Sequence, residues 1–440
     1  MVETPRLFVV RIAVADLFGK YSYELAPRAP SDSLSQLLIL YGENGTGKTT
    51  ILLLLNHLLS KKDGEGHRTF LARTQFTNIS AYLNDGTVLS ATRPKPTVGN
   101  FTMTMVKAGA KTEYEYLVNE KGAISFVSPN ADGHAAHEAF RLALPDLQLT
   151  FLADDRKISK ASGGSKLTQR AKRLGMPLPD GADDDPSALK PALDALREWA
   201  RSRAIEGSNV GQRDVNHVYI DLLRQISLAT EYKEPLGELF ERLGAQGVRS
   251  AKFSRFALTT EIDVDSIIKI ISHSSQARQH LMAQVIMPYL DSNEARFAAL
   301  DSLQKTLATF VDELNARFLK DKNVSFDLGR GVRVYSGEQV LDPRILSSGE
   351  KQLLVLFCDV AQASDQHAIF IIDEPELSLN VDWQRHLINA LQKLGSENVQ
   401  FILATHSLEL LARHRDNVAK LTDKGAAHGD PPVTTEGAEG

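Results

Sequence analysis

Residues Gly42 to Thr50 read GENGTGKTT, and they link the apolar stretch QLLILY to the leucine-rich stretch ILLLLNHLL. A glycine-rich loop that ends in Gly-Lys-Thr between a predicted strand and a predicted helix is typical of phosphate-binding loops. Its glycines let backbone N–H groups come close to phosphate oxygens, and the first turn of the helix adds the positive end of its dipole. We therefore predict that a nucleoside triphosphate binds at this turn.

Most positions of this phosphate loop are expected to contact the triphosphate. Lys48 is placed to reach the β and γ phosphates, and the hydroxyl of Thr49 is placed to ligate Mg²⁺. The pattern therefore predicts ATP and Mg²⁺ as the cofactors. The residues expected to bind the nucleotide are Gly42, Asn44, Gly45, Gly47, Lys48, Thr49 and Thr50.

A second stretch, AIFIIDEPELSL, places Asp373 and Glu374 directly after a run of apolar residues. Such a run predicts a buried strand that delivers both acids to its C-terminal end, where α/β sheets bind ligands. Two adjacent acids can divide the chemistry of phosphoryl transfer to water. We predict that Asp373 holds Mg²⁺ together with Thr49, and that Glu374 orients and deprotonates the attacking water.

Two further stretches are LSSGEKQLL, residues 346–354, and ILATHSLELL, residues 402–411, which places His406 after an apolar strand. In the first, Ser347, Ser348 and Gly349 precede a predicted helix, so their hydroxyl and N–H groups can form an anion site. The order of phosphate loop, signature, acidic strand and histidine resembles the ABC ATPase superfamily. The resemblance covers residues 6–156 and 324–415, and it is strongest to the SMC-like branch and the related overcoming-lysogenization-defect type.

This resemblance implies a nucleotide held between two copies of the chain. Of the signature residues, Ser348 and Gly349 would contact the γ-phosphate bound by the other copy. His406 would hydrogen-bond the γ-phosphate that lies beside Glu374. The family's D-loop, which crosses the dimer interface, matches Ser378 and Leu379. We therefore expect an ATP hydrolase that forms a homodimer or a higher even oligomer. The catalytic residues that the resemblance implies are Lys48, Glu374 and His406.

Two features of the family have several candidates in this sequence. One is the Q-loop, and the other is the aromatic residue that stacks on adenine. The sequence does not choose among the Q-loop candidates, and core packing is the expected role of each aromatic candidate. The candidates are Gln75, Gln148 and Arg156 for the Q-loop, and Phe18, Tyr21 and Tyr23 for the adenine contact.

The fold class predicted by these patterns is α/β: an ABC-type P-loop ATPase with a mixed central sheet, an antiparallel β subdomain and a helical insertion. Turn signals such as Asn84-Asp85-Gly86 between alternating stretches predict the antiparallel layer. The helices of the insertion are expected to be too short, and too interrupted by Gly and Pro, for a long coiled-coil arm. The expected domains are an N-terminal lobe over 1–156, a linker and helical insertion over 157–320, a C-terminal lobe over 321–422 and a disordered tail over 423–440.

The composition is that of an ordinary globular protein: 440 residues, 42% of them apolar and 24% charged. The single cysteine, Cys358, cannot form an internal disulfide and is expected in the core, which fits a reducing, cytoplasmic location. No stretch approaches the roughly 20 apolar residues of a spanning helix, so no membrane segment is predicted. The histidines His134, His137, His273 and His280 are expected at the surface rather than in a zinc site.

Three functions beyond ATP binding stay open. The first is a nucleotide-driven switch or sensor that controls a separate effector, a nuclease or toxin, in bacterial anti-phage defence, by analogy with SMC-like ATPases of this plan. The second is a DNA-binding repair or chromosome ATPase, favoured by a modest basic excess over residues 156–260. The third, the ATPase subunit of a transporter, is disfavoured by the long insertion. The basic residues that would serve a nucleic-acid partner include Arg170, Lys172, Arg173, Arg197, Arg201 and Arg203.

Overall fold

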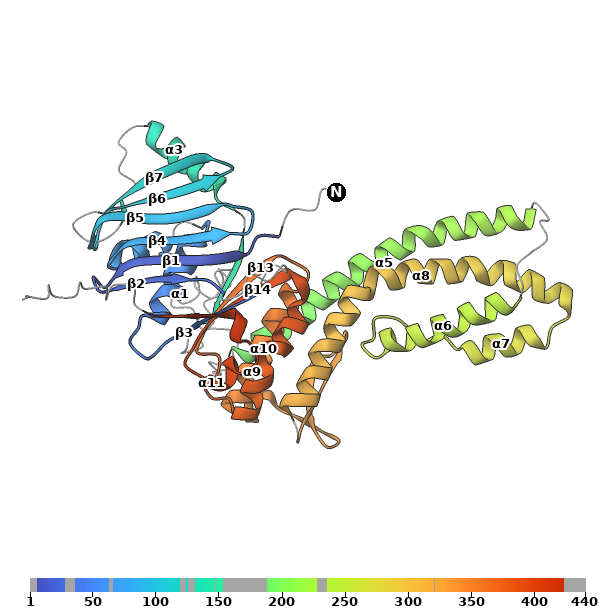
Figure 1. The fold of residues 1–440 in the computed structure, drawn as a ribbon. Coiled ribbons are helices and arrows are strands. Elements are labelled where there is room, and N and C mark those ends of the chain that lie inside the picture. The colour runs from blue at the N-terminus through green and yellow to red at the C-terminus, as the bar shows by residue number, and fades with distance from the viewer. Residues whose placement is uncertain are drawn as a thin grey trace, which may run out of the picture. The chain divides into compact units, whose positions relative to one another are not determined.

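The computed structural model describes residues 6–27, 36–62, 66–118, 124–125, 131–145, 147–152, 188–227, 236–319 and 321–422 (Figure 1). The chain divides into two compact units. Unit 1 holds residues 1–182, 366–388 and 397–440, and unit 2 holds residues 183–365 and 389–396. Most of the expected linker, the expected disordered tail and Arg156 lie outside the described residues.

A five-stranded sheet in unit 1 has every pair of neighbouring strands parallel, in the order β15-β3-β14-β13-β9. Strands β13 and β14 are buried along their whole length, as the apolar runs predict for a parallel sheet. The carboxyl ends of β3, β14 and β13 therefore lie side by side at one edge. The strands are β3 (Leu37–Tyr41), β9 (Gln148–Leu152), β13 (Ala368–Asp373), β14 (Val399–Thr405) and β15 (Val418–Lys420).

A seven-stranded antiparallel sheet, also in unit 1, has the order β2-β1-β4-β5-β6-β7-β8. The turn over Asn84, Asp85 and Gly86 joins β4 to β5, with Gly86 at φ 82°, so the hairpin prediction is confirmed. The α/β fold class is also confirmed, but the parallel and antiparallel pairings lie in two separate sheets rather than in one mixed sheet. The strands are β1 (Val9–Leu17), β2 (Tyr21–Leu25), β4 (Phe76–Leu83), β5 (Val88–Thr97), β6 (Phe101–Lys107), β7 (Ala110–Val118) and β8 (Ile124–Ser125).

Helix α1 (Lys48–Leu59) begins directly after the phosphate loop and packs against strands of both sheets. Its leucines lie in one core cluster with side chains such as Ile79 and Ile371, and burial of each leucine contributes about 1.5–3 kcal/mol. This packing fixes the helix N-terminus at the sheet edge. The other helices of this unit are α2 (His67–Arg73), α3 (Ala131–Ala143) and α11 (Leu408–Leu411).

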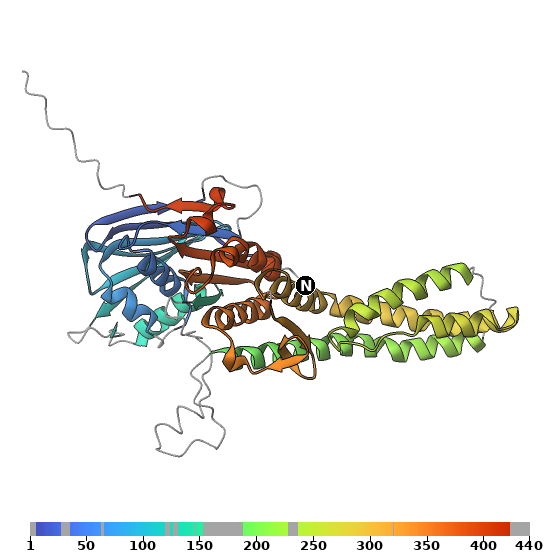
Figure 2. The same cartoon turned by 90° about the horizontal axis from the view of Figure 1, so that it is seen from below.

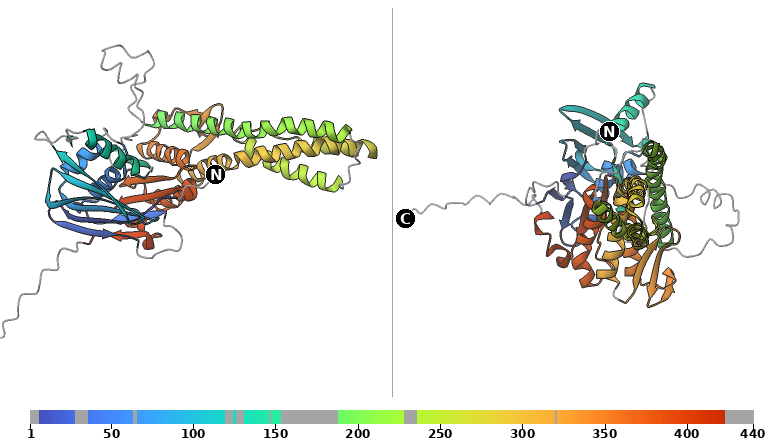
Figure 3. Two further views of the ribbon diagram at one scale, coloured as in Figure 1. Left: turned by 90° about the horizontal axis from the view of Figure 1, so that it is seen from above. Right: turned by 90° about the vertical axis from the view of Figure 1, so that its right-hand side faces the viewer.

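Unit 2 is built on two long helices, α5 (Leu189–Ser227) and α8 (Gln276–Glu313), which lie side by side in Figures 1, 2 and 3. They have 39 and 38 residues, so each is about 57 Å long. The expectation of short, interrupted helices was therefore wrong. Gly207 lies inside α5, where an added Cβ would come within 2.6 Å of the Leu300 side chain, so the glycine permits close packing rather than ending the helix.

The rest of unit 2 comprises further helices, a small sheet and the helix that begins at the predicted signature. Helices α6 (Leu236–Ser254) and α7 (Val264–Ser272) pack against α8, whose end continues as a π-helical turn over Leu314–Phe318. A three-stranded antiparallel sheet follows, with β10 (Asn323–Asp327), β11 (Gly331–Ser336) and β12 (Gln339–Leu341). Helix α9 (Ser348–Ala363) carries Cys358, which is buried as predicted. Helix α10 (Val381–Gly395) has residues in both units.

None of the described helices combines the length and the apolarity that crossing a lipid bilayer would require. Of the histidines expected at the surface, His273 is exposed, whereas His137 is buried. His137 packs among aromatic rings, with its Nε2 3.4 Å from the Tyr116 hydroxyl. The expectation was wrong for His137 because the antiparallel sheet and α3 enclose it.

Candidate nucleotide-binding site

The phosphate loop joins β3 to α1, and its backbone has the shape that its glycines permit. Gly45 and Gly47 have φ values of 84° and 86°, in the left-handed region that favours glycine. A Cβ added to Gly47 would lie 2.9 Å from the Leu17 side chain, so space as well as conformation requires glycine there. The Tyr23 hydroxyl donates a hydrogen bond of 3.0 Å to the Thr46 carbonyl and ties the loop to the antiparallel sheet.

Lys48 lies under this loop, with only 5% of its side chain exposed. Its Nζ donates to the carbonyl oxygens of Gly42 at 2.8 Å and Glu43 at 3.1 Å. By contrast, Asn44, Gly45 and Thr49 are exposed and Thr50 is half-buried. The loop therefore presents its backbone and the Thr49 hydroxyl to solvent, and it holds the lysine cation beneath.

The predicted acids lie at the carboxyl end of β13. Asp373 is the last residue of the strand and is 2% exposed, and Glu374 begins the following turn with φ 48°. The Glu374 N–H donates to the Ala404 carbonyl of β14 at 2.9 Å, which holds this unusual backbone conformation. Burial raises the pKa of Glu374 above its ordinary value, and the neighbouring Glu376 raises it further, while His406 opposes the shift.

His406 follows β14, the strand between β3 and β13, and its side chain meets the acid. The His406 Nδ1 lies 2.5 Å from the Glu374 Oε2, and the Lys48 Nζ lies 3.9 Å from the Glu374 Oε1. The structure thus brings the three residues expected to be catalytic to one edge of the sheet. A carboxylate held between a lysine and an imidazole can accept a proton from a water positioned beside it.

The sequence reasoning missed Glu376, which is 6% exposed and lies in the same turn. Its Oε1 accepts hydrogen bonds from the Thr405 hydroxyl, the His406 N–H and the Ser407 N–H. The signal that could have found it is the third acid of the stretch DEPE, residues 373–376, because only the first two acids were interpreted.

The donor groups at this edge fit a divalent cation. The Thr49 hydroxyl on the first turn of α1 and the Asp373 carboxylate at the end of β13 are oxygen ligands of the kind that Mg²⁺ prefers. Among the described residues, Glu374, Glu376 and His406 also offer ligand atoms within 4.8 Å of one another. Thr49 and Asp373 remain the predicted Mg²⁺ ligands, because Glu374 and His406 already contact each other.

The predicted signature forms a self-contained turn in unit 2. Ser347 caps helix α9: its hydroxyl accepts from the Glu350 N–H at 3.3 Å, and its own N–H donates to the Glu350 carboxylate at 2.7 Å. Burial alone would raise the pKa of Glu350, but hydrogen bonds from Lys322 and Ser347 outweigh it and lower that pKa. Ser348 is exposed and Gly349 is buried. The turn thus offers a hydroxyl at a helix N-terminus.

The open Q-loop candidates separate by position. Gln148 opens β9 and pairs in register with Ala368 at the start of β13, so it lies at the edge opposite the phosphate loop. Gln75 lies in the short segment between α2 and β4, where its side-chain Nε2 donates to the Pro96 carbonyl at 2.8 Å. The described residues therefore argue against Gln148.

The aromatic candidates for the adenine contact differ in how exposed they are. Tyr23 is 4% exposed and belongs to the core cluster, and Tyr21 packs against that cluster, as expected. Phe18 was expected in the core but is 46% exposed, with φ 57°. Its ring lies 3.5 Å from the position of an added Cβ on Gly47, beside the phosphate loop. Strand β1 ends at Leu17, and Phe18 begins the turn that follows it.

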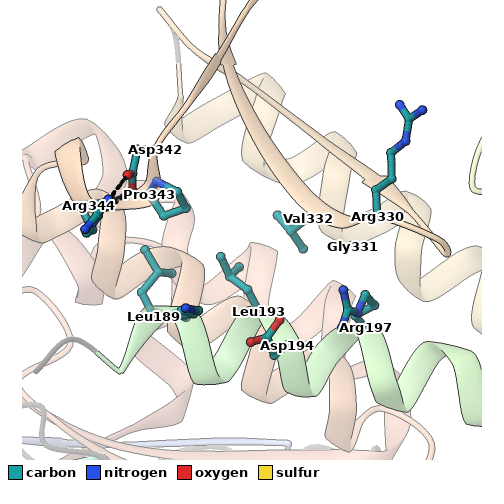
Figure 4. A pocket seen from close by; sticks show the side chains of 11 residues that line it. Leu189, Leu193, Asp194, Arg197, Arg330, Gly331, Val332, Asp342, Pro343 and Arg344 are labelled. Atoms are coloured by element: carbon teal, nitrogen blue, oxygen red, sulfur yellow. Dashed lines mark hydrogen bonds and ion pairs between the residues drawn. The ribbon is translucent and has the colours of Figure 1, made fainter. Parts of the chain in front are cut away.

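Unit 2 contains a hollow of about 340 Å³ between the start of α5 and the β10–β12 sheet (Figure 4). Leu189, Leu193 and Val332 line its middle, and the charged side chains around it include Asp194 and Arg197. The hollow shares no residue with the predicted nucleotide contacts.

Several known proteins are similar in sequence to parts of this chain. Residues 222–412 match a family model described as "AAA domain, putative AbiEii toxin, Type IV TA system". A putative ABC transporter ATP-binding protein of Pyrococcus abyssi is 38% identical over 81 residues, which is 18% of this chain and 30% of that protein. The retron Ec83 probable ATPase of Escherichia coli is 38% identical over 73 residues, 14% of this chain and 13% of that protein.

Among solved structures, the Smc head domain of Pyrococcus furiosus bound to the C-terminal domain of ScpA aligns with 94% of this chain and 96% of its own, at 12% identity and a TM-score of 0.36. In its motifs and in these sequence matches, the chain is similar to P-loop ATPases of the ABC type. The chain covers 30%, 15% and 30% of the length of the first three curated relatives that it matches.

Proposed function

We propose that the chain hydrolyses ATP at a site completed by a second copy, and that the cycle of closure and opening controls a separate effector. One observation carries the hydrolytic part: Glu374, the predicted base, lies between Lys48 of the phosphate loop and His406. These residues come from three loops that follow β3, β13 and β14. A surface ion pair would not need such convergence at the ligand-binding edge of a parallel sheet.

In the proposed reaction, the phosphate-loop N–H groups and Lys48 bind the triphosphate. Mg²⁺, when held by Thr49 and Asp373, supplies charge neutralisation to the phosphate oxygens. Glu374 accepts a proton from the attacking water, and its raised pKa makes it a better base than an exposed carboxylate. His406 keeps the Glu374 carboxylate in place through the Nδ1 contact, and half of its side chain is exposed, so its ring would be accessible to the γ-phosphate of a bound ATP.

The proposal that a second copy completes the site rests on two exposed turns. Ser348 is exposed at the N-terminus of α9, where a hydroxyl and free backbone donors suit a phosphate. Ser378, at the predicted D-loop, is also exposed and has φ 63°, a conformation that costs about 1–3 kcal/mol and is often retained for function. We propose that both turns face the partner copy in the closed state.

Mixing two inactive variants tests the shared site. If the site is shared, a copy with Lys48→Ala has an inactive phosphate loop but an intact signature. A copy with Ser348→Arg has an intact phosphate loop but a blocked signature. A mixed dimer then retains one intact site, so mixing restores roughly a quarter of wild-type turnover if copies pair at random. Each variant alone should be inactive. No recovery on mixing, with both variants folded and exchanging subunits, would mean that each chain works alone.

The effector role is supported by the names of two relatives. The matching family is described by a toxin–antitoxin system, and one relative is a retron ATPase. We propose that this chain likewise acts beside a nuclease or toxin in anti-phage defence. Purifying the Glu374→Gln protein with ATP from its native cells should retain that effector, whereas Lys48→Ala should release it. Recovery of the same partners with both variants would contradict nucleotide control.

DNA binding is the second candidate, and the described basic residues of unit 2 favour it less. Arg201 donates to the Leu328 and Gly329 carbonyls, and Arg203 forms ion pairs with Glu206 and Asp365. These guanidinium groups already serve the fold. ATP-dependent DNA binding that weakens steeply with salt would reverse this ranking.

A further inference from the structure

Glu376 lies two residues after the predicted base, and the turn directs its side chain back toward β14. The Leu377 N–H donates to the Glu374 carbonyl at 3.1 Å, which closes a tight turn with Pro375 as its second residue. Proline is favoured at that position because its φ is already set. The sequence Glu-Pro-Glu-Leu therefore reverses the chain directly after β13 and places Glu376 at the third position of the turn.

The Glu376 carboxylate is buried at the end of the neighbouring strand β14. Its Oε1 accepts three hydrogen bonds: from the Thr405 hydroxyl, from the His406 N–H at 3.1 Å and from the Ser407 N–H at 3.2 Å. A buried carboxylate costs several kcal/mol unless such bonds satisfy it. The carboxylate and the backbone after β14 therefore fix each other.

This backbone carries the histidine of the site. The His406 Nδ1 lies 2.5 Å from the Glu374 Oε2 and 3.5 Å from the Glu376 Oε1. On the other side of His406, the Ser407 hydroxyl caps α11 and donates to the Gln384 Oε1 at 2.8 Å. His406 thus stands between two anchored points, and Glu376 is the anchor that also belongs to the turn of the base.

We propose that Glu376 is a positioning residue: its Oε1 holds the turn after β14 so that the His406 imidazole meets Glu374. The effect of Glu376 on the rate of ATP hydrolysis rests on the proposed function. Its effect on the conformation of the turn after β14 does not depend on that function. The three donors need an acceptor oxygen rather than a negative charge. Glutamine can supply that oxygen in the same place, and alanine cannot.

The test compares Glu376→Ala with Glu376→Gln in the full-length chain. Amide hydrogen exchange, measured without nucleotide, reports on the N–H groups of His406 and Ser407. We expect Glu376→Ala to speed the exchange of the His406 N–H at least about tenfold, since this amide loses its acceptor. The Ser407 N–H should be affected less, because it also donates to the Thr405 Oγ1 at 2.9 Å. We expect its kcat for ATP to fall about 10²-fold, the scale of a small misplacement, with KM changed less than about threefold. Glu376→Gln should stay within about threefold of wild type in both measurements.

Glu409→Ala is the matched control, because Glu409 lies on α11 and pairs with Arg385 at the surface. It should change neither exchange nor kcat. Wild-type exchange and kcat in Glu376→Ala would overturn the proposal, and so would equal losses in the Ala and Gln variants. If the wild-type chain binds ATP without turnover, the proposed function fails, and the exchange of the two variants still decides the role of Glu376.

Discussion

The Nζ of Lys48 lies 3.9 Å from the Oε1 of Glu374, although the two residues are far apart in the sequence. The same ammonium group donates to the carbonyl oxygens of Gly42 and Glu43. Because β14 is the only strand between β3 and β13, their terminal loops are close enough for this contact. A change at Glu374 therefore alters both the base and the surroundings of the phosphate-binding lysine.

Replacing Glu374 by glutamine should separate ATP binding from hydrolysis. The amide keeps the size of the side chain but cannot accept the proton, so kcat should fall by about 10²–10⁴. The affinity for ATP should stay the same or rise, since a negative charge beside the phosphates is removed. Equilibrium binding and phosphate release check the two quantities, with Glu409→Gln as control. Phosphate release at the wild-type rate would rule out Glu374 as the base.

The raised pKa of Glu374 should also appear in stability. Burial and Glu376 favour its protonated form in the folded state, so its contribution to stability is present at low pH. That contribution is lost as pH rises through the raised pKa. Glu374→Gln should therefore increase the melting temperature at pH 8 and change it little at pH 4. An equal shift at both pH values would contradict this account.

His57 gives a prediction of opposite sign in a different part of unit 1. Burial lowers its pKa to about 4, helped by His67 and Arg68. The unfolded chain therefore binds a proton that the folded chain refuses, and stability falls as pH drops from about 6.5 toward 4. We expect about 2 kcal/mol less stability at pH 5 than at pH 7.5, measured by urea unfolding. His57→Gln should remove most of this difference in stability between the two pH values. If the difference is unchanged in the variant, other titratable groups cause it.

Phe18 is predicted to stack on the adenine of ATP. It is exposed beside Gly47 and holds a left-handed backbone conformation. Base stacking on an aromatic side chain contributes about 1–3 kcal/mol, so Phe18→Ala should weaken ATP binding by roughly tenfold or more. Phe18→Tyr keeps the ring and should bind as the wild type does. Titration calorimetry measures both, and equal affinity in the alanine variant would exclude the contact.

Two helical glycines of unit 2 provide a matched pair. An added Cβ at Gly207 of α5 would lie 2.6 Å from Leu300, whereas at Gly244 of α6 it would meet nothing within 4 Å. Gly244→Ala should stabilise unit 2 by about 0.5–1 kcal/mol through helix propensity. Gly207→Ala should instead cost about 1–3 kcal/mol by overpacking. Urea unfolding monitored by circular dichroism checks the signs, and stabilisation by both substitutions would contradict the close packing of α5 and α8.

Local patterns predicted the elements around the nucleotide site well. The bounds of α1 follow directly from the phosphate loop and the leucine run. Strands β13 and β14 coincide with the apolar runs before Glu374 and His406, because fully buried strands consist of continuous apolar residues. The lengths of α5 and α8 were not predicted. A helical glycine costs only about 1 kcal/mol, and packing between two long helices outweighs that local cost.

Within the candidate site, Lys48, Asp373 and Glu374 were proposed from the pattern of their own segments, and the structure brings them to one edge of the sheet. Their roles stay predictions. Glu376 was missed because its role depends on the pairing of β13 with β14, and its partners lie about thirty residues further along the chain. Phe18 was expected in the core, as is usual for an aromatic side chain, but it lies in the exposed turn directly after β1.

The signature turn has a shape set by folding alone. Ser347 and Glu350 satisfy each other, and Lys322 clamps the glutamate from the segment that follows α8. The turn is therefore already ordered before a triphosphate binds, and the chain would lose little conformational entropy when the triphosphate binds to it. Most of the binding free energy between the nucleotide on one copy and the turn of the other would then stabilise the dimer, even if the contact area were small.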